Sequence, residues 1–513
     1  MSVGPAVRFR SGDLRASDIR ALKHGGRSYV LDPEARAVVD RAASVVHAIA
    51  KRGESVYGVN TGFGKLAHRS IPHDQLAQLQ RNLVVSHACG VGPPLPEHIV
   101  RLIVTLKINS LARGYSGIRW SVLEMLAACL ERDLLPVIPA KGSVGASGDL
   151  APLAHLAATL IGVGDATYRG ERLPASVALE RAGLAPLELQ EKEGLALLNG
   201  TQVSTALALD ALLEAEDALA ASLVAGALSV EAALGSVQPF DERIHAIRGH
   251  REQRDIAASL RALLGTSEIN ESHRDCGRVQ DPYSLRCMPQ VLGACLHALR
   301  DAWSVLVVEA NGVSDNPLVF VETNEVISGG NFHAEPVALV ADSLAVAIAE
   351  IGNISERRTA LLVDPTFSAL PAFLATEPGL ESGYMIPQVT SAALASENKL
   401  LAHPASVDSI PTSAGQEDHV SMATHGAYRL RTMLDNVRAI VAIELLTAAR
   451  GIDLRRPLRT SDALEGALAR VSPAERGGDR YIAPDIERVA ELVRAATFTP
   501  LVADLFPSVD GSL

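Results

Sequence analysis

The residues best suited to chemistry lie in one short stretch, Lys141–Ala157, which reads KGSVGASGDLAPLAHLA. Its centre, Gly145–Asp149, nearly matches the G-x-S-x-G turn that presents a nucleophilic serine, but Asp149 stands where that turn has glycine. Ser147 is therefore a nucleophile, part of a phosphate-binding loop, an ordinary loop residue, or a residue with less usual chemistry. The surrounding sequence distinguishes these interpretations.

Several common kinds of active site are not supported. A phosphate-binding loop needs G-x-x-x-x-G-K-[ST] after a strand, and the glycine-rich segment Gly58–Gly64 lacks that pattern. The sequence has no H-E-x-x-H and no His/Cys spacing typical of zinc, so no metal or nucleotide is expected. A serine hydrolase needs a strand before the serine in an α/β chain, whereas this chain is rich in alanine and leucine, which favour helices. A serine in a glycine-rich turn is most often an ordinary loop residue.

The neighbours of Ser147 favour a more specific interpretation. Asp149 is a good N-cap for a helix that begins at Leu150, and Pro152 falls in its first turn, where no intrahelical N–H is needed. The Ala146–Gly148 segment would then lie at the positive end of a helix dipole, which stabilises negative charge. Because these residues are small, the chain can turn tightly enough for the glycine nitrogen to approach the alanine carbonyl carbon.

Long segments rich in alanine and leucine follow from about residue 201, and each predicts a long helix. They cover residues 201–234, 289–311, 336–358, 388–402 and 423–450. Gly235 and Gly451 are expected to end the first and the last of them. A helix of about 28 residues is about 42 Å long, so the fold class is predicted to be all-α with a long central helical bundle. Residues 1–200 are expected to form an N-terminal globular part that carries the Ser147 loop, and residues 201–513 the bundle and a C-terminal helical region.

The composition restricts the class of protein. The formal net charge of −12 argues against a nucleic-acid-binding surface or a polybasic membrane contact. The scattered cysteines, Cys89, Cys129, Cys276, Cys287 and Cys295, are typical of free thiols in a reducing compartment. No signal peptide is evident, and the longest apolar run, residues 218–230, is too short to span a bilayer. We therefore expect a cytoplasmic protein that binds neither nucleic acid nor membrane.

The string Gly145–Leu153, GASGDLAPL, resembles the signature of the aromatic amino-acid ammonia-lyases. Further blocks resemble that family in order: YGVNTGFG (57–64), LNGT (198–201), QDPYSLR (280–286), DNPL (315–318), GNFH (330–333) and QEDH (416–419). In the family Ala-Ser-Gly cyclises and loses water, so the resemblance implies that Ala146, Ser147 and Gly148 form the electrophilic group 4-methylideneimidazole-5-one (MIO). It also implies an aspartase/fumarase-like all-α fold and a homotetramer whose active sites draw on three subunits, with Tyr57 and Phe332 from different ones.

The resemblance also implies roles for single residues. Ser147 would supply the electrophilic carbon, and Tyr57 would be the base that removes the β-proton. Because a free tyrosine ionises only near pH 10, several helix N-termini and an arginine would have to lie close to it. Arg286 would bind the substrate carboxylate with its guanidinium fork, and its spacing of three from Tyr283 and Gln280 predicts one helical face pointing into the cavity. The other expected contributors are Tyr283 near the prosthetic group, Phe332 packed over it, the amides of Asn199, Gln280 and Asn316, and Asp149 as a supporting residue.

His87 and Glu417 match positions that mark the histidine-specific members of this family. A buried carboxylate can accept a hydrogen bond from an imidazole N–H, whereas a phenyl ring would leave it desolvated and unpaired. The resemblance therefore implies that L-histidine loses ammonia to give trans-urocanate, the first step of histidine degradation. Alternatives are a 2,3-aminomutase with the same prosthetic group, a tyrosine or phenylalanine ammonia-lyase, and a non-catalytic relative, which should have lost some of these residues.

Overall fold

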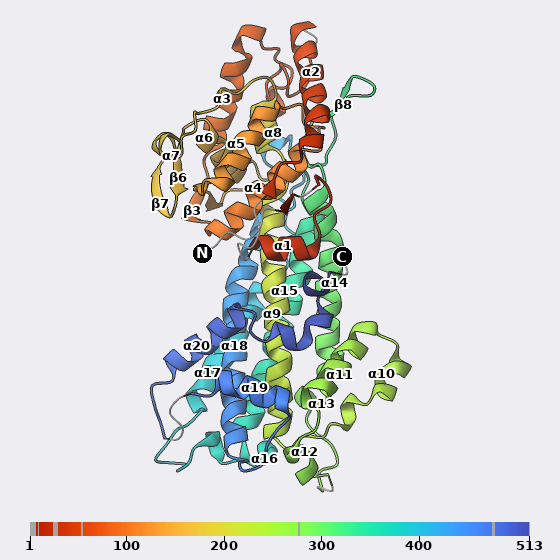
Figure 1. The fold of residues 1–513 in the computed structure, drawn as a ribbon, viewed down its shortest axis with the longest axis vertical. Helices are drawn as coiled ribbons and strands as arrows, with labels where there is room; N and C mark the ends of the chain where they lie inside the picture. The colour runs from red at the N-terminus through yellow and green to blue at the C-terminus, as the bar shows by residue number, and fades with distance from the viewer. Residues whose placement is uncertain are drawn as a thin grey trace.

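The computed structural model describes residues 7–8, 10–23, 29–52, 55–274, 277–473 and 478–511. These residues form an elongated, mostly helical molecule whose longest helices run along its length, with most of the segments before residue 200 gathered at one end (Figure 1). The strands within these ranges are only two to four residues long. The predicted all-α class is confirmed.

The N-terminal part consists of medium-length helices and small sheets. Its helices are α1 (Ala16–Lys23), α2 (Arg36–Arg52), α3 (Leu76–His87), α4 (Glu97–Leu111), α5 (Trp120–Glu131), α6 (Leu150–Leu160), α7 (Ala175–Arg181) and α8 (Glu193–Leu198). Its strands are β1 (Val7–Arg8) parallel to β2 (Tyr29–Val30), β3 (Val91–Pro94) antiparallel to β5 (Pro139–Lys141), and the antiparallel set β4 (Leu134–Pro136), β6 (Asp165–Tyr168) and β7 (Glu171–Pro174).

The bundle is formed by α9 (Gln202–Ala232), α14 (Met288–Asn311), α15 (Glu335–Val363) and α18 (Ala423–Asp453). Around it lie α10 (Glu242–Arg248), α11 (Arg251–Leu264), α12 (Glu268–Ser272), α13 (Tyr283–Arg286), α16 (Pro365–Ser368), α17 (Met385–Leu401), α19 (Asp462–Val471), α20 (Ala483–Arg494) and α21 (Pro507–Asp510). A hairpin of β8 (Leu318–Phe320) and β9 (Glu325–Ile327) extends from the loop between α14 and α15. All five predicted long helices are present.

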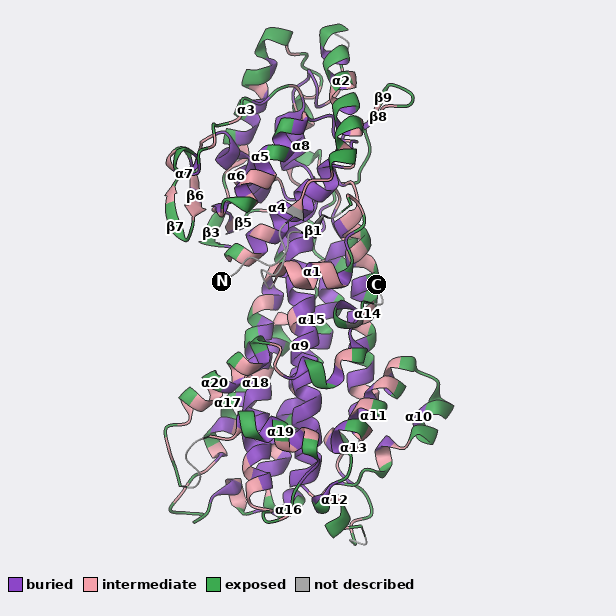
Figure 2. Ribbon diagram, in the orientation of Figure 1, coloured by how far each residue is buried: buried purple, intermediate pink, exposed green. Residues whose placement is uncertain are grey.

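α9 is the central helix of the bundle, and almost every residue along it is buried (Figure 2). Such a helix is apolar around most of its circumference, as the alanine and leucine residues of α9 are, and its few buried acidic residues need partners. α15 and α18 begin at the same end as α9 and pack along it, whereas α14 runs in the opposite direction and ends beside the N-terminal part. Three long helices therefore begin at the end of the bundle that faces the N-terminal part.

Two expected helix ends are wrong by a few residues. Leu234 (φ +53°), and not Gly235, takes the left-handed backbone conformation that follows α9. Gly235 is the next residue, and its N–H donates to the Val230 carbonyl oxygen (2.7 Å), which completes the end of the helix. Gly451 does not end α18, which continues to Asp453. A Cβ atom on Gly451 would lie 2.8 Å from Ala232 Cβ, so this glycine allows close packing of α18 on α9.

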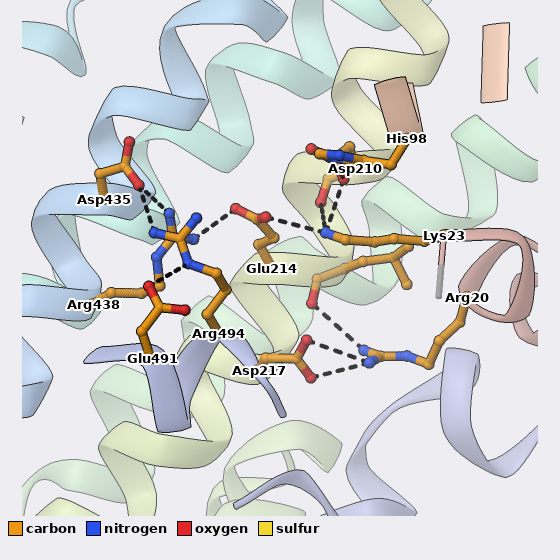
Figure 3. A network of polar contacts seen from close by, with 11 residues as sticks. Arg20, Lys23, His98, Asp210, Glu214, Asp217, Asp435, Arg438, Glu491 and Arg494 are labelled. Atoms are coloured by element: carbon orange, nitrogen blue, oxygen red, sulfur yellow. Dashed lines mark hydrogen bonds and ion pairs between the residues drawn. The ribbon is translucent and has the colours of Figure 1, made fainter. Parts of the chain in front are cut away.

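Acidic residues of α9 lie at the middle of the molecule, where α1 crosses the bundle, and Figure 3 shows their partners. Lys23 Nζ pairs with Asp210 (2.8 Å) and Glu214 (3.2 Å), and Arg20 Nη1 pairs with Asp217 (3.0 Å). Removing one partner of a buried ion pair leaves an uncompensated charge and is strongly destabilising. These pairs therefore fix α1 against the centre of α9.

The division at residue 200 stays a prediction. Val319 in the β8–β9 hairpin packs in one apolar cluster with Ala42 and Val46 of α2, so a segment beyond residue 201 contributes to the N-terminal part. The four cysteines within the described ranges are free thiols, and burial raises the pKa of Cys129 and of Cys295 to about 12. Cys276 lies outside the described residues.

Candidate active site

The turn that carries Ser147 lies where four helices begin. α6 starts three residues after Ser147. α18 and α15 start against the turn, because Met422 and Ala334, which directly precede them, donate backbone N–H groups to its carbonyl oxygens (2.9 and 3.2 Å). α9 starts beside it, since the Gly200 carbonyl accepts an N–H from the turn (2.8 Å). The positive ends of four helix dipoles therefore meet at this turn, as expected for a site that stabilises negative charge.

Two glycines make this close packing possible. Gly148 has a φ of +71°, and a Cβ atom there would lie 2.2 Å from the Gly200 carbonyl oxygen. Gly145 has a φ of +68°, and a Cβ atom there would lie 2.2 Å from Ser421 Oγ. No side chain fits at either position, so the turn can contact the starts of α9 and α18 only with glycine.

Asp149 supports the turn in a different way from the one predicted. It directly precedes α6, but its side chain makes no hydrogen bond to that helix. Oδ2 instead accepts from the backbone N–H groups of Val203 (3.0 Å) and Ser204 (2.8 Å) in the first turn of α9, and Oδ1 accepts from Thr424 Oγ1 (2.5 Å) in α18. The predicted cap on α6 is wrong, because α9 packs closely enough to offer Asp149 its own unpaired N–H groups.

Ser147 contacts two of the predicted site residues directly. Its hydroxyl donates to Glu417 Oε1 (2.5 Å), and its carbonyl oxygen accepts from Asn199 Nδ2 (2.7 Å). Asn199 Oδ1 is buried and has no hydrogen-bond partner among the described residues. The amide thus fixes the serine carbonyl while one acceptor of Asn199 remains available beside it.

A cavity of about 1100 Å³ opens over Ser147. The predicted site residues that line it are Tyr57, His87, Ala146, Ser147, Asn199, Asn316, Phe332 and Glu417. The Tyr57 ring meets Phe63 edge to face with centroids 6.5 Å apart, and the Tyr57 hydroxyl accepts a long hydrogen bond from Gly64 N (3.4 Å). The cavity is large enough for an amino acid with an aromatic side chain.

Tyr57 and Phe332 line this cavity within one chain. The expectation that different subunits supply them to one active site stays a prediction. α14 ends and α15 begins at the end of the bundle where the Tyr57 loop lies, and the loop between them therefore meets the Tyr57 loop. The contact is close, because a Cβ atom on Gly58 would lie 2.9 Å from Pro317 Cδ. Asn316 in the same loop is held by Gly329 N, which donates to its Oδ1 (2.6 Å).

His87 and Glu417 both line the cavity. Burial lowers the pKa of His87, and the negative charge of Glu417 acts in the opposite direction. His87 Nδ1 is 3.0 Å from Ser86 Oγ, and Glu417 Oε2 accepts from Thr412 Oγ1 (2.5 Å). A carboxylate held in this way beside Ser147 is well placed to accept an N–H from a ligand in the cavity.

Gln280, Tyr283 and Arg286 do not reach this cavity in the same chain. They lie in and before α13, which packs at the far end of α9, where Ser236 N donates to Asp281 (2.7 Å; Figure 1). Ser147 lies at the start of α9, and a helix of 31 residues is about 46 Å long. Within one chain these three residues therefore do not line the cavity. Their predicted place in the active site, and the predicted arginine close to Tyr57, depend on the expected contact with another subunit.

The three residues nevertheless form one cluster. Arg286 Nη2 donates to Gln280 Oε1 (3.1 Å), and the Arg286 guanidinium lies over the Tyr283 ring at 4.7 Å from its centroid. The Tyr283 side chain is 71% exposed. An exposed tyrosine beneath an arginine presents a cation and a hydroxyl to whatever contacts this end of the bundle.

Two histidines in the cavity wall were not among the predicted site residues, although they end the GNFH and QEDH blocks. His333 Nε2 lies 3.4 Å from His419 Nδ1 and 3.3 Å from the His419 carbonyl oxygen. With Glu335 they offer three ligand atoms within 4.8 Å of one another, which suits a divalent cation. A hydrogen bond between the two rings accounts for the same contact without a cation.

Comparison with known proteins places the chain among aromatic lyases. A family model described as aromatic amino acid lyase matches residues 14–473. A protein named histidine ammonia-lyase from Burkholderia pseudomallei (strain 668) is 60% identical over 497 residues, which cover 96% of this chain and 98% of that protein. The crystal structure of histidine ammonia-lyase from Trypanosoma cruzi is similar, with a TM-score of 0.90 and 40% identity over 98% of this chain and 96% of that one. A tyrosine aminomutase from Streptomyces globisporus has a TM-score of 0.92 and 34% identity over 98% and 99%.

Proposed function

The chain belongs to the aromatic amino acid lyase family, and from this membership we propose that it is a histidine ammonia-lyase, which converts L-histidine to trans-urocanate and ammonia. The observation that carries the proposal is the position of Glu417. Its carboxylate accepts a hydrogen bond from the Ser147 hydroxyl (2.5 Å) and lines the same cavity as His87. An imidazole N–H is the part of histidine that satisfies such a carboxylate, and a tyrosine or phenylalanine ring has none.

We propose further that Ala146, Ser147 and Gly148 form the MIO group of this family. The structure of the turn fits that group, because Gly148 has no side chain to obstruct its amide and the positive ends of four helices surround the turn. Asn199 Nδ2 holds the Ser147 carbonyl oxygen, which would become a carbonyl of the ring. The group would supply an electrophilic carbon, which makes loss of the amine and of a poorly acidic β-proton possible.

The protein side chains would bind the substrate and move its proton. Tyr57 would remove the β-proton, since it lines the same cavity as Ser147. Glu417 would accept the imidazole N–H of the substrate, with His87 beside it, and Phe332 would cover the ring. Asn199 and Asn316 would offer amide groups from the cavity wall. Arg286 would hold the substrate carboxylate, with Tyr283 and Gln280 beside it.

The last of these roles requires a second copy of the chain. A carboxylate site that contains Arg286 can be completed only if the α13 end of one chain lies against the Ser147 end of another, because about 46 Å separates them within a chain. We propose a homotetramer built from the long helices. Its interfaces would cover apolar side chains exposed on α14, α15 and α17, such as Val308 (70% exposed), Leu339 (57%) and Leu400 (76%).

The proposed assembly also accounts for the apolar outward faces of α14 and α15, which matter for where the protein is located in the cell. By length and composition alone α14 and α15 could cross a membrane, but both pack against α9, and 44% and 67% of their most apolar windows are buried. Their outward faces are the ones that the proposed subunit contacts would cover. We propose a cytoplasmic enzyme without membrane or nucleic-acid partners.

A second candidate function is a 2,3-aminomutase, because tyrosine aminomutases share the fold over nearly the whole chain. A tyrosine or phenylalanine ammonia-lyase is disfavoured by Glu417, and a non-catalytic role by the presence of every residue named above. Incubation with L-histidine, L-tyrosine and L-phenylalanine distinguishes these functions. We expect near-ultraviolet absorbance from urocanate with histidine only, whereas a β-amino acid product would identify an aminomutase.

The role of Ser147 is tested by Ser147→Ala, which should abolish turnover with the fold intact. Ser44→Ala on the exposed face of α2 is the matched control and should retain full activity. Activity retained by Ser147→Ala would rule out the prosthetic-group role of this residue.

A further inference from the structure

A fully buried lysine lies directly behind the Ser147 turn, outside the cavity. Lys107 is on α4, is 1% exposed, and is absent from the cavity wall. Its Nζ donates to the Asn199 carbonyl oxygen (2.7 Å) and to Gln202 Oε1 (3.3 Å). It therefore contacts the segment between α8 and α9, which packs against the turn.

This lysine differs from its buried neighbour Lys192. Lys192 Nζ pairs with Asp315 at 2.6 Å, and both side chains are buried. Lys107 forms no ion pair with any carboxylate in the described ranges, and both of its acceptors are uncharged. Burial lowers the pKa of Lys107 to about 7, although the more distant charges of Asp315 and Asp149 act in the opposite direction. A buried cation without a direct counter-charge is costly to the folded state, so stability does not explain its presence.

The contacts of Lys107 lead to the atoms that must react. The Asn199 carbonyl that Lys107 holds belongs to the same residue whose side-chain amide holds the Ser147 carbonyl (2.7 Å). The next residue, Gly200, pairs with Gly148 as a parallel β-bridge. Two hydrogen bonds thus connect the Lys107 amine to the Ser147 carbonyl through Asn199, and the next residue, Gly200, lies against the Gly148 backbone.

Cyclisation of the turn requires this backbone to be held tightly. A bond forms between the Gly148 nitrogen and the Ala146 carbonyl carbon, and two water molecules leave. One takes the Ala146 oxygen with the amide protons of Ser147 and Gly148, and the other takes the Ser147 hydroxyl with its Cα proton. Attack by a backbone amide depends on close approach and orientation, which fixed neighbours provide.

We propose that Lys107 is a positioning residue for this cyclisation: it holds Asn199 and Gly200 against Ser147 and Gly148. The inference rests on the proposed prosthetic group and assigns a role to a residue that touches neither substrate nor reacting atoms.

The test is Lys107→Met, which keeps the length of the side chain and removes its charge and its hydrogen bonds. The readout is the mass of the proteolytic peptide that contains residue 147, which reports whether two water molecules have been lost and needs no substrate. We expect the cyclised fraction to fall at least about tenfold while circular dichroism shows a retained fold. In the cyclised remainder, kcat for histidine should fall and KM should not change, because Lys107 does not line the cavity.

Lys23→Met is the matched control, because Lys23 is also cationic and mostly covered but pairs with Asp210 and Glu214 at the middle of the bundle (Figure 3). We expect it to lower the melting temperature and leave cyclisation complete. Complete cyclisation in Lys107→Met would overturn the proposal. An equal loss of the cyclised fraction in Lys107→Met and Lys23→Met would also overturn it. If Lys107→Met does not fold, Lys107→Gln, which is neutral but keeps a donor, is read by the same criterion.

The measurement separates this inference from the proposed function. A wild-type chain that has lost two water molecules but forms no urocanate would contradict histidine ammonia-lyase activity, and the Lys107 comparison would still decide the positioning role. A wild-type chain that retains both water molecules would overturn the prosthetic group and the inference together.

Discussion

Two inactive variants of this protein should restore activity to each other when they are produced in the same cell. The first is Ser147→Ala, which removes the proposed electrophile, and the second is Arg286→Ala, which removes the proposed carboxylate clamp. Because about 46 Å separates the two residues within a chain, no chain can use its own Arg286 at its own Ser147 turn. An active site that combines them must take Ser147 from one chain and Arg286 from another.

The size of the recovery follows from this geometry. At equal expression and random assembly, half of the Ser147 positions and half of the Arg286 positions are intact. The chain that supplies Ser147 to a site is independent of the chain that supplies Arg286. About one quarter of the sites then contain both residues, whatever the number of subunits in a closed ring of such contacts. The purified mixture should therefore form urocanate at about one quarter of the wild-type rate per chain, while each variant alone is nearly inactive.

A second mixture is the control. Tyr57 and Ser147 line one cavity of one chain, so Ser147→Ala mixed with Tyr57→Phe should show no recovery. The assay is urocanate absorbance on tandem-tagged mixed oligomers, with size-exclusion chromatography to confirm that both mixtures assemble. Absence of recovery in the first mixture, or recovery in the second, would refute the assignment of these residues to chains.

Four further outcomes are expected. Gly148→Ala should leave the peptide at residue 147 uncyclised by mass and the enzyme inactive, since its Cβ would lie 2.2 Å from the Gly200 oxygen. Glu417→Gln should lower kcat/KM for histidine by about tenfold or more while lowering any turnover of tyrosine less, measured with both substrates. Arg358→Met leaves the fully buried Glu444 without its cation (Nη2–Oε2 2.8 Å), so urea denaturation should show a loss of about 3–5 kcal/mol. Because burial lowers the pKa of Lys107 from 10.5 to about 7, the unfolded chain binds more protons than the folded one between these values. Between about pH 7 and pH 10.5 the free energy of unfolding of the wild type relative to Lys107→Met should therefore rise by about 1.4 kcal/mol per pH unit, and no change with pH would contradict the burial of a titrating lysine.

The sequence alone determined those properties that depend on local composition. Long runs of alanine and leucine predicted the five long helices, because helix propensity and the spacing of apolar residues act over a few turns of one segment. The GASGD turn before a helix start located Ser147 at the positive end of a dipole, because that relation also lies within about ten residues. The small residues around Ser147 predicted a tight turn, because a turn also depends only on residues that are close in the sequence.

The tertiary structure decided everything that depends on which segments meet. Asp149 was a sound N-cap for α6 by its position, yet its carboxylate binds the start of α9, since packing brought unpaired N–H groups from another helix within reach. Gly451 looked like a helix end and proved to be a close contact with Ala232. Arg286 matched a block as clear as that of Ser147, but the length of α9 puts it at the opposite end of the chain. Spacing along a sequence does not contain these distances, because they are set by helices packed side by side and, for the proposed role of Arg286, would be set by the contact between one chain and another.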